Sequence, residues 1–387
     1  MKNAIEKRVG IIGGGQLGKM MILEAKRLGV YVATLDPGLD CPSHSISDEH
    51  IVAGFHDVAA IGQLAEKVDV VTYEFEHINA EALAELEAGG NVIYPSVTGL
   101  KTIQDKLLQK VKLRENGVKV PDFEAIDGLG RLREYAARRG YPIMIKSRKN
   151  GYDGKGNFVA RCEADLETGF FKELKGDAQA LMVEEFIDFE MEVSVVAARG
   201  IDGAKVVYPV ARNVHVNGIL DTTVAPAALT AGLNKTIQDA AEKVMDIFDG
   251  VGTFCVEMFV GKDGTVHINE IAPRPHNSGH YTIEGCRVNQ FENHIRAIIG
   301  LPLGDTTLVH GAVIMRNLLG LSDGRAVAGG VEEACKHAGV NVHIYGKKES
   351  RKGRKMGHYT VTAESMDKAE AIDRKIAGVV QITGGAE

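Results

Sequence analysis

The chain has 387 residues, with 45 Lys and Arg against 52 Asp and Glu, so its formal net charge is −7. Hydrophobic residues make up 44% and charged residues 25%, the values of ordinary globular proteins. This composition excludes disordered, collagen-like and coiled-coil architectures, and the length predicts two or three domains. An acidic chain without an apolar run near the roughly 18 residues of a membrane helix is expected to bind neither nucleic acid nor membrane.

The first hundred residues alternate between strand and helix patterns. We predict strands and helices in this order: strand 9–12, helix 17–28, strand 30–35, strand 69–73, helix 80–87 and strand 91–94. This β-α-β order predicts an open parallel sheet with helices on both faces.

The pattern changes after residue 100. One helix is predicted with Ile103, Leu107 and Val111 on one side, followed by paired strands and a hairpin turn at Asn217-Gly218. The later predicted elements are strands 142–146, 157–160, 181–186, 191–197, 205–210, 253–260 and 265–271, and helices 231–248 and 366–376.

The five cysteines are widely spaced and form no CxxC pair, and the first residues lack the apolar run of a signal peptide. We therefore expect neither a disulfide framework nor a structural zinc site. We expect the protein to be in a reducing compartment, the cytoplasm.

A glycine motif follows the first predicted strand. Gly13, Gly15 and Gly18 fit GxGxxG, and Asp36 ends the next strand, which is the context of a dinucleotide-binding fingerprint. The same loop would suit any phosphate-bearing ligand at a helix N-terminus. A nicotinamide cofactor, another phosphorylated ligand and a tight turn without a ligand all remain open.

A second glycine-rich loop, from Lys146 to Asn157, contains three glycines and four cations but lacks the GK[ST] ending of a Walker A motif. Such a loop suits a flap that closes over polyphosphate, although many basic loops are merely solvated hairpins.

Glu257 and Glu270 lie on the two strands of a predicted hairpin. A turn centred on Lys262-Asp263 would place Glu257 opposite Ile268, with Glu270 as its diagonal neighbour on the same face. With Asn269, these oxygens suit Mg²⁺ bound jointly with ATP phosphates; two solvent-facing carboxylates are the alternative. The following run through His280 is rich in Pro, Arg, His and Asn, and we expect a loop that presents these groups into a cleft.

Together, the strand with Lys146, its glycine loop, the segment 183–187 and the acidic hairpin resemble the ATP-grasp superfamily. Nearly the whole chain is similar to the N5-carboxyaminoimidazole ribonucleotide synthetase family within it. The segments that carry this resemblance are 12–18, 72–77, 151–156, 208–209, 213–215, 269–280 and 353–358.

This resemblance implies an α/β ATP-grasp fold in three parts. Residues 1–102 would form a Rossmann-like substrate domain and 103–305 the ATP-grasp part, with a small mobile subdomain at about 120–187 and a metal-binding portion at about 188–305. Residues 306–387 would form a small α+β part that completes the substrate site.

The resemblance also implies an ATP-dependent carbon–nitrogen ligase of de novo purine biosynthesis, acting as a homodimer. Bicarbonate and ATP would give carboxyphosphate, and this intermediate, or CO₂ released from it, would carboxylate the amine of 5-aminoimidazole ribonucleotide. The product would be N5-carboxyaminoimidazole ribonucleotide.

Roles for individual residues follow from the same resemblance. ATP would be bound by Lys106, Lys146, Gly151, Tyr152, Asp153, Gly154, Lys155, Gly156, Asn157, Glu184, Glu185, Phe186, Ile187, Glu192, His215, Asn269 and Glu270. The ribonucleotide would contact Gly14, Gly15, Gln16, Leu17, Glu74, His276, Asn277, Ser278, Lys347, Arg354 and Lys355. Mg²⁺ would be held by Glu257 and Glu270, and the catalytic group would comprise Glu74, Tyr152, Asp153 and Arg274.

Two points remain open within these roles. Asp153 and Glu74 are both candidates for the proton acceptor. Lys106 stands where the family usually has arginine, so it keeps a positive charge but loses the bidentate fork.

Three alternatives compete with this interpretation. A formate-dependent glycinamide ribonucleotide transformylase would share the Pro-Arg-Pro-His loop. A nicotinamide dehydrogenase would explain only the first glycine motif and Asp36, and a non-catalytic nucleotide-binding regulator would leave the catalytic groups without a use.

Overall fold

The computed structural model describes residues 3–149, 151, 156–167 and 181–385. Its N-terminal sheet is parallel, with the strand order β3-β2-β1-β4. The strands are β1 (Val9–Ile12), β2 (Val32–Asp36), β3 (Glu49–Val52) and β4 (Val70–Tyr73). β1, β2 and β4 are wholly buried, as the continuous apolar runs of a parallel sheet require.

Helices cover both faces of this sheet, as predicted. α1 (Gln16–Arg27) and α10 (Gln290–Ile299) pack on one face, and α2 (Val58–Glu66) and α3 (Ala80–Ala88) on the other. β3 and α2 were not predicted. The predicted strand 91–94 is wrong as a full strand, because only an isolated bridge joins Ile93 to Val71.

The single helix predicted through Ile103 and Val111 is also wrong. The chain forms α4 (Val97–Ile103) and α5 (Lys106–Glu115) instead. Asp105 separates them, because its carboxylate accepts hydrogen bonds from the amides of Leu107 at 3.0 Å and Leu108 at 3.4 Å and so caps the second helix.

A small antiparallel sheet follows, with the order β5-β8-β6-β7. Its strands are β5 (Phe123–Ile126), β6 (Ile143–Ser147), β7 (Asn157–Ala160) and β8 (Leu181–Glu185). The helix α6 (Leu129–Arg139) and the short η2 (Glu163–Glu167) pack against it around one apolar cluster.

The largest sheet has nine strands, all antiparallel, in the order β14-β13-β9-β11-β12-β15-β19-β17, with β10 paired to β9. The strands from the middle of the chain are β9 (Phe189–Arg199), β10 (Lys205–Val207), β11 (Ala211–Val216), β12 (Ile219–Ala225), β13 (Gly252–Gly261) and β14 (Val266–Ala272). The helix α8 (Ala231–Ile247) covers β9 and β13. Asn217 and Gly218 have positive φ angles, as the predicted two-residue hairpin turn requires.

Strands of the C-terminal segment extend this large sheet, because β15 pairs with β12. The elements of this segment are β15 (Ala312–Leu319), β16 (Gly324–Gly329), α11 (Val331–Ala334), β17 (Val340–Ile344), β18 (Glu349–Ser350), β19 (Lys355–Ala363), α12 (Met366–Ile376) and β20 (Gln381–Gly385). β16, β18 and β20 form a separate three-stranded sheet. Three short helical turns, η1 (Ala4–Glu6), η4 (Asn277–Gly279) and α9 (Thr282–Gly285), are the remaining elements of the described residues.

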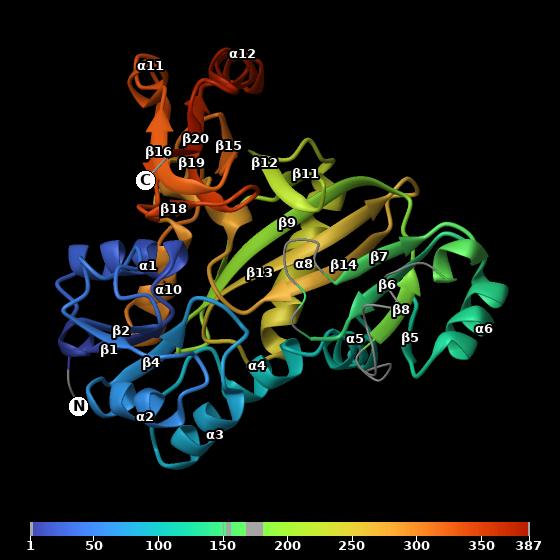
Figure 1. Ribbon diagram of the computed structural model, residues 1–387, viewed down its shortest axis with the longest axis horizontal. Coiled ribbons are helices and arrows are strands. Elements are labelled where there is room, and N and C mark those ends of the chain that lie inside the picture. The colour runs from blue at the N-terminus through green and yellow to red at the C-terminus, as the bar shows by residue number, and fades with distance from the viewer. Residues whose placement is uncertain (1–2, 150, 152–155, 168–180, 386–387) are drawn as a thin grey trace.

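In Figure 1 the small sheet lies at one end of the molecule and the N-terminal sheet at the other, with β9, β13 and β14 between them. Among the described residues, no helix is both long and apolar enough to cross a membrane.

His294 on α10 joins the N-terminal sheet to the large one. Its Nδ1 accepts a hydrogen bond from the amide of Thr253 on β13 at 3.1 Å, so the proton of the neutral ring lies on Nε2, which is 2.9 Å from Oγ1 of Thr72 on β4. If Nδ1 were protonated, it would become a hydrogen-bond donor facing the amide donor of Thr253, and this hydrogen bond would be lost. Burial lowers the pKa of His294 to about 3.

We therefore expect His294 to make the folded protein sensitive to acid. Below pH 6.5 the unfolded chain binds a proton at this imidazole and the folded chain does not, so stability falls by about 1.4 kcal/mol per pH unit until about pH 3. Urea unfolding at pH 7.5, 6.0 and 5.0 should show a shallower pH dependence for His294→Gln than for wild type. The exposed His310→Gln serves as the control and should keep the wild-type slope. Equal slopes for His294→Gln and wild type would contradict this role.

Candidate functional site

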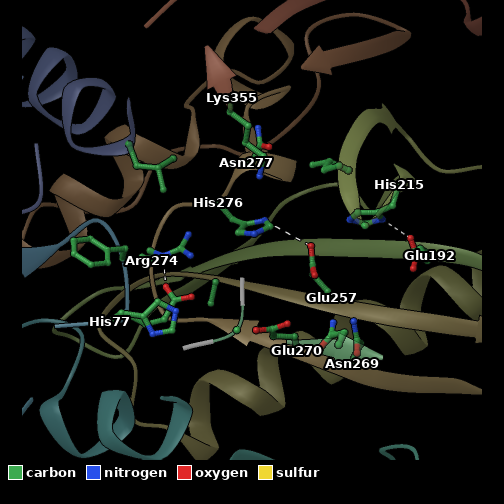
Figure 2. A pocket seen from close by; sticks show the side chains of 18 of the residues that line it. His77, Glu192, His215, Glu257, Asn269, Glu270, Arg274, His276, Asn277 and Lys355 are labelled. Carbon is green, nitrogen blue, oxygen red and sulfur yellow. Dashed lines mark hydrogen bonds and ion pairs between the residues drawn. The ribbon is translucent and has the colours of Figure 1, made fainter. Parts of the chain in front are cut away.

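A cavity of about 870 Å³ opens where the N-terminal, small and large sheets meet. The loop after β4 contributes Glu74 and Glu76, the small sheet Lys146, and the large sheet the acidic hairpin. Figure 2 shows this pocket, with Glu257 and His276 pointing toward each other and Lys355 entering from the C-terminal segment. The cavity brings together these predicted residues: Gln16, Leu17, Glu74, Lys146, Gly151, Asn157, Glu192, His215, Glu257, Asn269, Glu270, Arg274, His276, Asn277 and Lys355.

Other predicted residues lie beside the cavity. Lys106 lines a smaller adjoining recess together with Gly151 and Glu270. The following do not line the cavity: Gly14, Gly15, Gly156, Glu184, Glu185, Phe186, Ile187, Ser278, Lys347 and Arg354. Tyr152, Asp153, Gly154 and Lys155 lie outside the described residues.

Several lining residues received no role in the sequence analysis: Phe75, Glu76, His77, Met144, Asn217, Gly218, Leu220, Phe259 and Ala272. Glu76 and His77 lie in the segment 72–77 that carries the family resemblance, so the sequence could have identified them as site residues. The apolar lining residues could not be identified in this way, because an apolar residue on a strand predicts core packing equally well.

The acidic hairpin differs from its predicted register. Glu257 pairs directly with Glu270, and Met258 with Ile268, because a bulge leaves Asn269 as an extra residue on β14. The prediction that Glu257 faces Ile268 is therefore wrong. A bulge re-aims the side chains beside it, and here it places two carboxylates directly opposite each other.

These carboxylates need positive charge between or beside them. Burial raises the pKa of Glu257, and the charge of Glu270 adds to this shift. Lys106 forms an ion pair with Glu270, while Nδ1 of His276 lies 3.8 Å from Oε1 of Glu257. The two carboxylates and the Asn269 amide oxygen are the hard donors that Mg²⁺ prefers. No group of three or more His, Cys, Asp or Glu side chains in the described part of the chain could hold a metal by itself.

A buried lysine pair shares one carboxylate next to the hairpin. Lys146 on β6 donates to Oδ1 of Asn269 at 2.9 Å and forms an ion pair with Glu184 on β8. Nζ of Lys110 on α5 lies 2.7 Å from Oε2 of Glu184. Burial alone would raise the pKa of Glu184, but the two ammonium groups outweigh it and lower the pKa to about 2. Burial lowers the pKa of Lys110 to about 8, against the opposing effect of the Glu184 carboxylate.

Arg274 ties the loop after β14 to the N-terminal sheet. Its Nε donates to Oε2 of Glu76 at 2.6 Å. Burial would raise the pKa of Glu76, but the Arg274 guanidinium lowers it to about 2. The side chain of Gln104 donates to the carbonyl of Glu76 at 2.7 Å and so fixes this loop.

The first glycine loop is occupied by carboxylates of the chain itself. The amides of Gly15 and Gly18 donate to Glu74 at 2.5 and 2.7 Å, and the amide of Gly14 donates to Asp36 at 2.8 Å. Burial raises the pKa of Glu74. A dinucleotide would find neither the amides nor Asp36 available, which argues against the nicotinamide alternative. Gln16 lines the cavity beside this loop.

The histidines of the cavity are held by neighbours. Burial alone would lower the pKa of His215, but its ion pair with Glu192 and the nearby Glu257 outweigh burial and raise the pKa. Burial lowers the pKa of His276 well below its usual range, and its Nδ1 lies 2.9 Å from Oγ of Ser278. Two amide–amide hydrogen bonds of 3.0 and 2.8 Å join Asn277 to Asn317 on β15.

The C-terminal segment contains a basic cluster, which reaches the cavity through Lys355 and consists of Lys347, Lys348, Arg351, Lys352, Arg354 and Lys355. Nζ of Lys347 donates to the carbonyl of Lys355 at 2.6 Å, and the Arg354 guanidinium donates to the carbonyl of Glu349 at 2.8 Å. Both side chains therefore contact backbone oxygens in this structure.

Comparison with protein families matches three models along the chain. Residues 6–104 match the ribonucleotide synthetase preATP-grasp domain, and residues 111–291 match the ATP-grasp domain. Residues 313–372 match the phosphoribosylaminoimidazole carboxylase C-terminal domain.

Curated relatives agree with these matches. The N5-carboxyaminoimidazole ribonucleotide synthase of Bacillus subtilis is 39% identical over 360 residues, covering 93% of this chain and 92% of that protein. The phosphoribosylaminoimidazole carboxylase of Schizosaccharomyces pombe is 40% identical over 371 residues, covering 94% of this chain. The chain spans 66% of the length of that yeast protein.

Solved structures show the same arrangement. The N5-carboxyaminoimidazole ribonucleotide synthetase of Thermotoga maritima is 41% identical, with a TM-score of 0.89 over 98% of this chain and all of that one. The synthase of Aspergillus clavatus in complex with ADP and 5-aminoimidazole ribonucleotide is 35% identical, with a TM-score of 0.90 over 97% of this chain and 99% of that one. The predicted α/β ATP-grasp fold is thereby confirmed, and the chain belongs to the N5-carboxyaminoimidazole ribonucleotide synthase family of ATP-grasp enzymes.

Proposed function

We propose that the chain is an ATP-dependent ligase that carboxylates 5-aminoimidazole ribonucleotide with bicarbonate in purine biosynthesis. The observation that carries this proposal is one cavity that joins the acidic hairpin and Lys146 to the loops of the N-terminal and C-terminal segments. Such a cavity has room for a nucleotide and a second substrate side by side, and a solved relative holds ADP together with 5-aminoimidazole ribonucleotide.

ATP would lie between the small sheet and the hairpin. Lys146 and the loop from Gly151 to Asn157 would hold the phosphates, and the backbone groups of segment 184–187 would hold the adenine. Glu192 and His215, which are paired with each other, would face the ribose. Mg²⁺, held by Glu257 and Glu270, would supply charge neutralisation to the phosphates.

The reaction would proceed in two steps. A bicarbonate oxygen attacks the γ-phosphorus of ATP, so that the bond to the β-phosphate oxygen breaks and carboxyphosphate and ADP form. Arg274 then faces the growing phosphoryl charge, and its ion pair with Glu76 keeps the guanidinium oriented. In the second step the substrate amine attacks the carboxyl carbon of carboxyphosphate, and phosphate leaves. Alternatively, carboxyphosphate first releases CO₂ and phosphate, and the amine attacks the CO₂.

The ribonucleotide would lie against the N-terminal sheet, near Gln16, Leu17 and Glu74. Lys355 would face its phosphate, with Lys347 and Arg354 behind it. Glu74 is buried and lines the cavity, which supports it as acceptor of the amine proton; Asp153 is the other candidate. His276, Asn277 and the nearby Ser278 would shape the imidazole pocket.

We also propose a cytoplasmic homodimer whose three parts divide near residues 102 and 305. The five free cysteines suit a reducing compartment. The dimer and the division rest on the family resemblance.

The first test measures ADP release from MgATP and bicarbonate, with and without 5-aminoimidazole ribonucleotide. We expect strong stimulation by the ribonucleotide that disappears when bicarbonate is removed, because carboxyphosphate is useful only with an acceptor. Absence of stimulation in folded, ATP-binding protein would overturn the carboxylase assignment. Formate with glycinamide ribonucleotide would then test the transformylase alternative.

The second test removes one proposed metal ligand. Glu270→Ala should lower the ribonucleotide-dependent ATP turnover by at least about a hundredfold, because phosphoryl transfer depends on the metal for charge stabilisation. Circular dichroism should show an intact fold. The exposed Glu332→Ala on α11 is the matched control and should retain wild-type turnover. Retained turnover in Glu270→Ala would remove the metal assignment.

A further inference from the structure

Lys110 is a buried charge for which the proposed chemistry has no direct use. It lies on α5, its side chain is 2% exposed, and its ammonium pairs with a Glu184 carboxylate that is also 2% exposed. Nζ also lies 3.4 Å from the carbonyl of Ile268, two residues before Glu270. Lys110 therefore connects a helix, the small sheet and the strand that carries the acidic hairpin.

Burying a lysine and a glutamate is costly, because both charges lose their hydration. A well-packed apolar pair of similar volume is often equally or more stable. Stability of the fold alone is thus a weak reason for Lys110 and Glu184 to be charged. The pair does, however, alter the surroundings of Lys146, which shares the same carboxylate and reaches Asn269 in the cavity.

Lys110 changes the net charge of the group of side chains around Lys146. Two ammonium groups share one carboxylate, so the cluster of Lys110, Lys146 and Glu184 carries one net positive charge. Without Lys110, Glu184 would neutralise Lys146 completely, and the cluster would present no net charge to the cavity. Within the described residues, the ion pairs of Glu184 are with these two lysines.

We propose that Lys110 is a positioning residue that balances Glu184 and thereby leaves the positive charge of Lys146 available to the phosphates of the nucleotide. This inference rests on the proposed ATP site. Lys110 itself touches no substrate. It acts through the charge of Glu184, which would otherwise neutralise the ammonium of Lys146.

The test compares ligands with and without phosphates. Dissociation constants for ADP and for adenosine are measured by calorimetry with wild type, Lys110→Met and Lys112→Met. Lys112 lies on the same helix and is only partly buried, so it is the matched control. Lys110→Met should bind ADP about 10- to 100-fold more weakly, the value of one charged hydrogen bond, and adenosine as wild type does. Steady-state kinetics should show a raised KM for ATP and an unchanged KM for the ribonucleotide.

A rescue variant separates charge balance from packing. Lys110→Met combined with Glu184→Gln removes both charges and leaves Lys146 as the cation, so it should regain most of the ADP affinity. If Lys110→Met does not fold, Glu184→Gln alone still tests the idea: it should bind ADP at least as tightly as wild type, and weaker binding would contradict the proposal.

The remaining outcomes distinguish failure of the role of Lys110 from failure of the proposed nucleotide site. Unchanged ADP affinity in folded Lys110→Met, or equal losses for ADP and adenosine, would overturn the role of Lys110. Failure of the wild-type protein to bind ADP would instead overturn the proposed nucleotide site.

Discussion

Glu257 and Glu270 stand directly opposite each other on neighbouring strands, and like charges so placed repel. Neighbouring groups reduce part of this electrostatic repulsion. Lys106 pairs with Glu270 from α5, whereas the imidazole of His276, which burial keeps neutral, approaches Glu257 from the following loop without adding positive charge. The hairpin is therefore a site of concentrated negative charge whose partners come from outside it, and a divalent cation with phosphates suits that arrangement.

Positive and negative groups of the cavity are paired across separate parts of the fold. Arg274 follows the large sheet, but Glu76 follows the N-terminal one. Lys146 belongs to the small sheet and reaches Asn269 on the large one. Because each sheet supplies polar or charged partners for another, the site exists only when the three are assembled. The buried contacts of His294 with β4 and β13 serve the same assembly at a distance from the cavity.

Local patterns in the sequence predicted the secondary structure well where the periodicity of apolar residues is regular. Strand 157–160 and helix 366–376 have the predicted bounds, because alternation or helical periodicity is undisturbed there. The helix through residue 103 was wrong, because the capping carboxylate of Asp105 interrupts an otherwise continuous apolar stripe. Register in the acidic hairpin failed for a similar reason, since a bulge depends on packing between strands and leaves no mark on the pattern of residues.

The candidate site was predicted mainly through residues with distinctive chemistry. Arg274, His276 and Glu270 line the cavity as expected. Lys110 was not predicted, because a lysine in a polar helix looks like a solvated one until the fold buries it. The first glycine loop was ambiguous for a different reason: glycines permit close approach, but whether a ligand or the chain's own carboxylate makes that approach depends on Glu74, 56 residues away from Gly18.

The continuity of the large sheet into the C-terminal segment has a consequence for how the molecule can be divided. β15 pairs with β12, so residues 306–387 cover what would otherwise be an open sheet edge. β12 contains no Lys or Pro that would discourage pairing with another chain. A chain ending near residue 305 would expose that edge as a template for aggregation. The small sheet is different, because its four strands pair only among themselves in the part of the chain that the structure describes. In physical terms, the C-terminal segment is part of the scaffold, whereas the small sheet is joined to it through side-chain contacts such as that between Lys146 and Asn269.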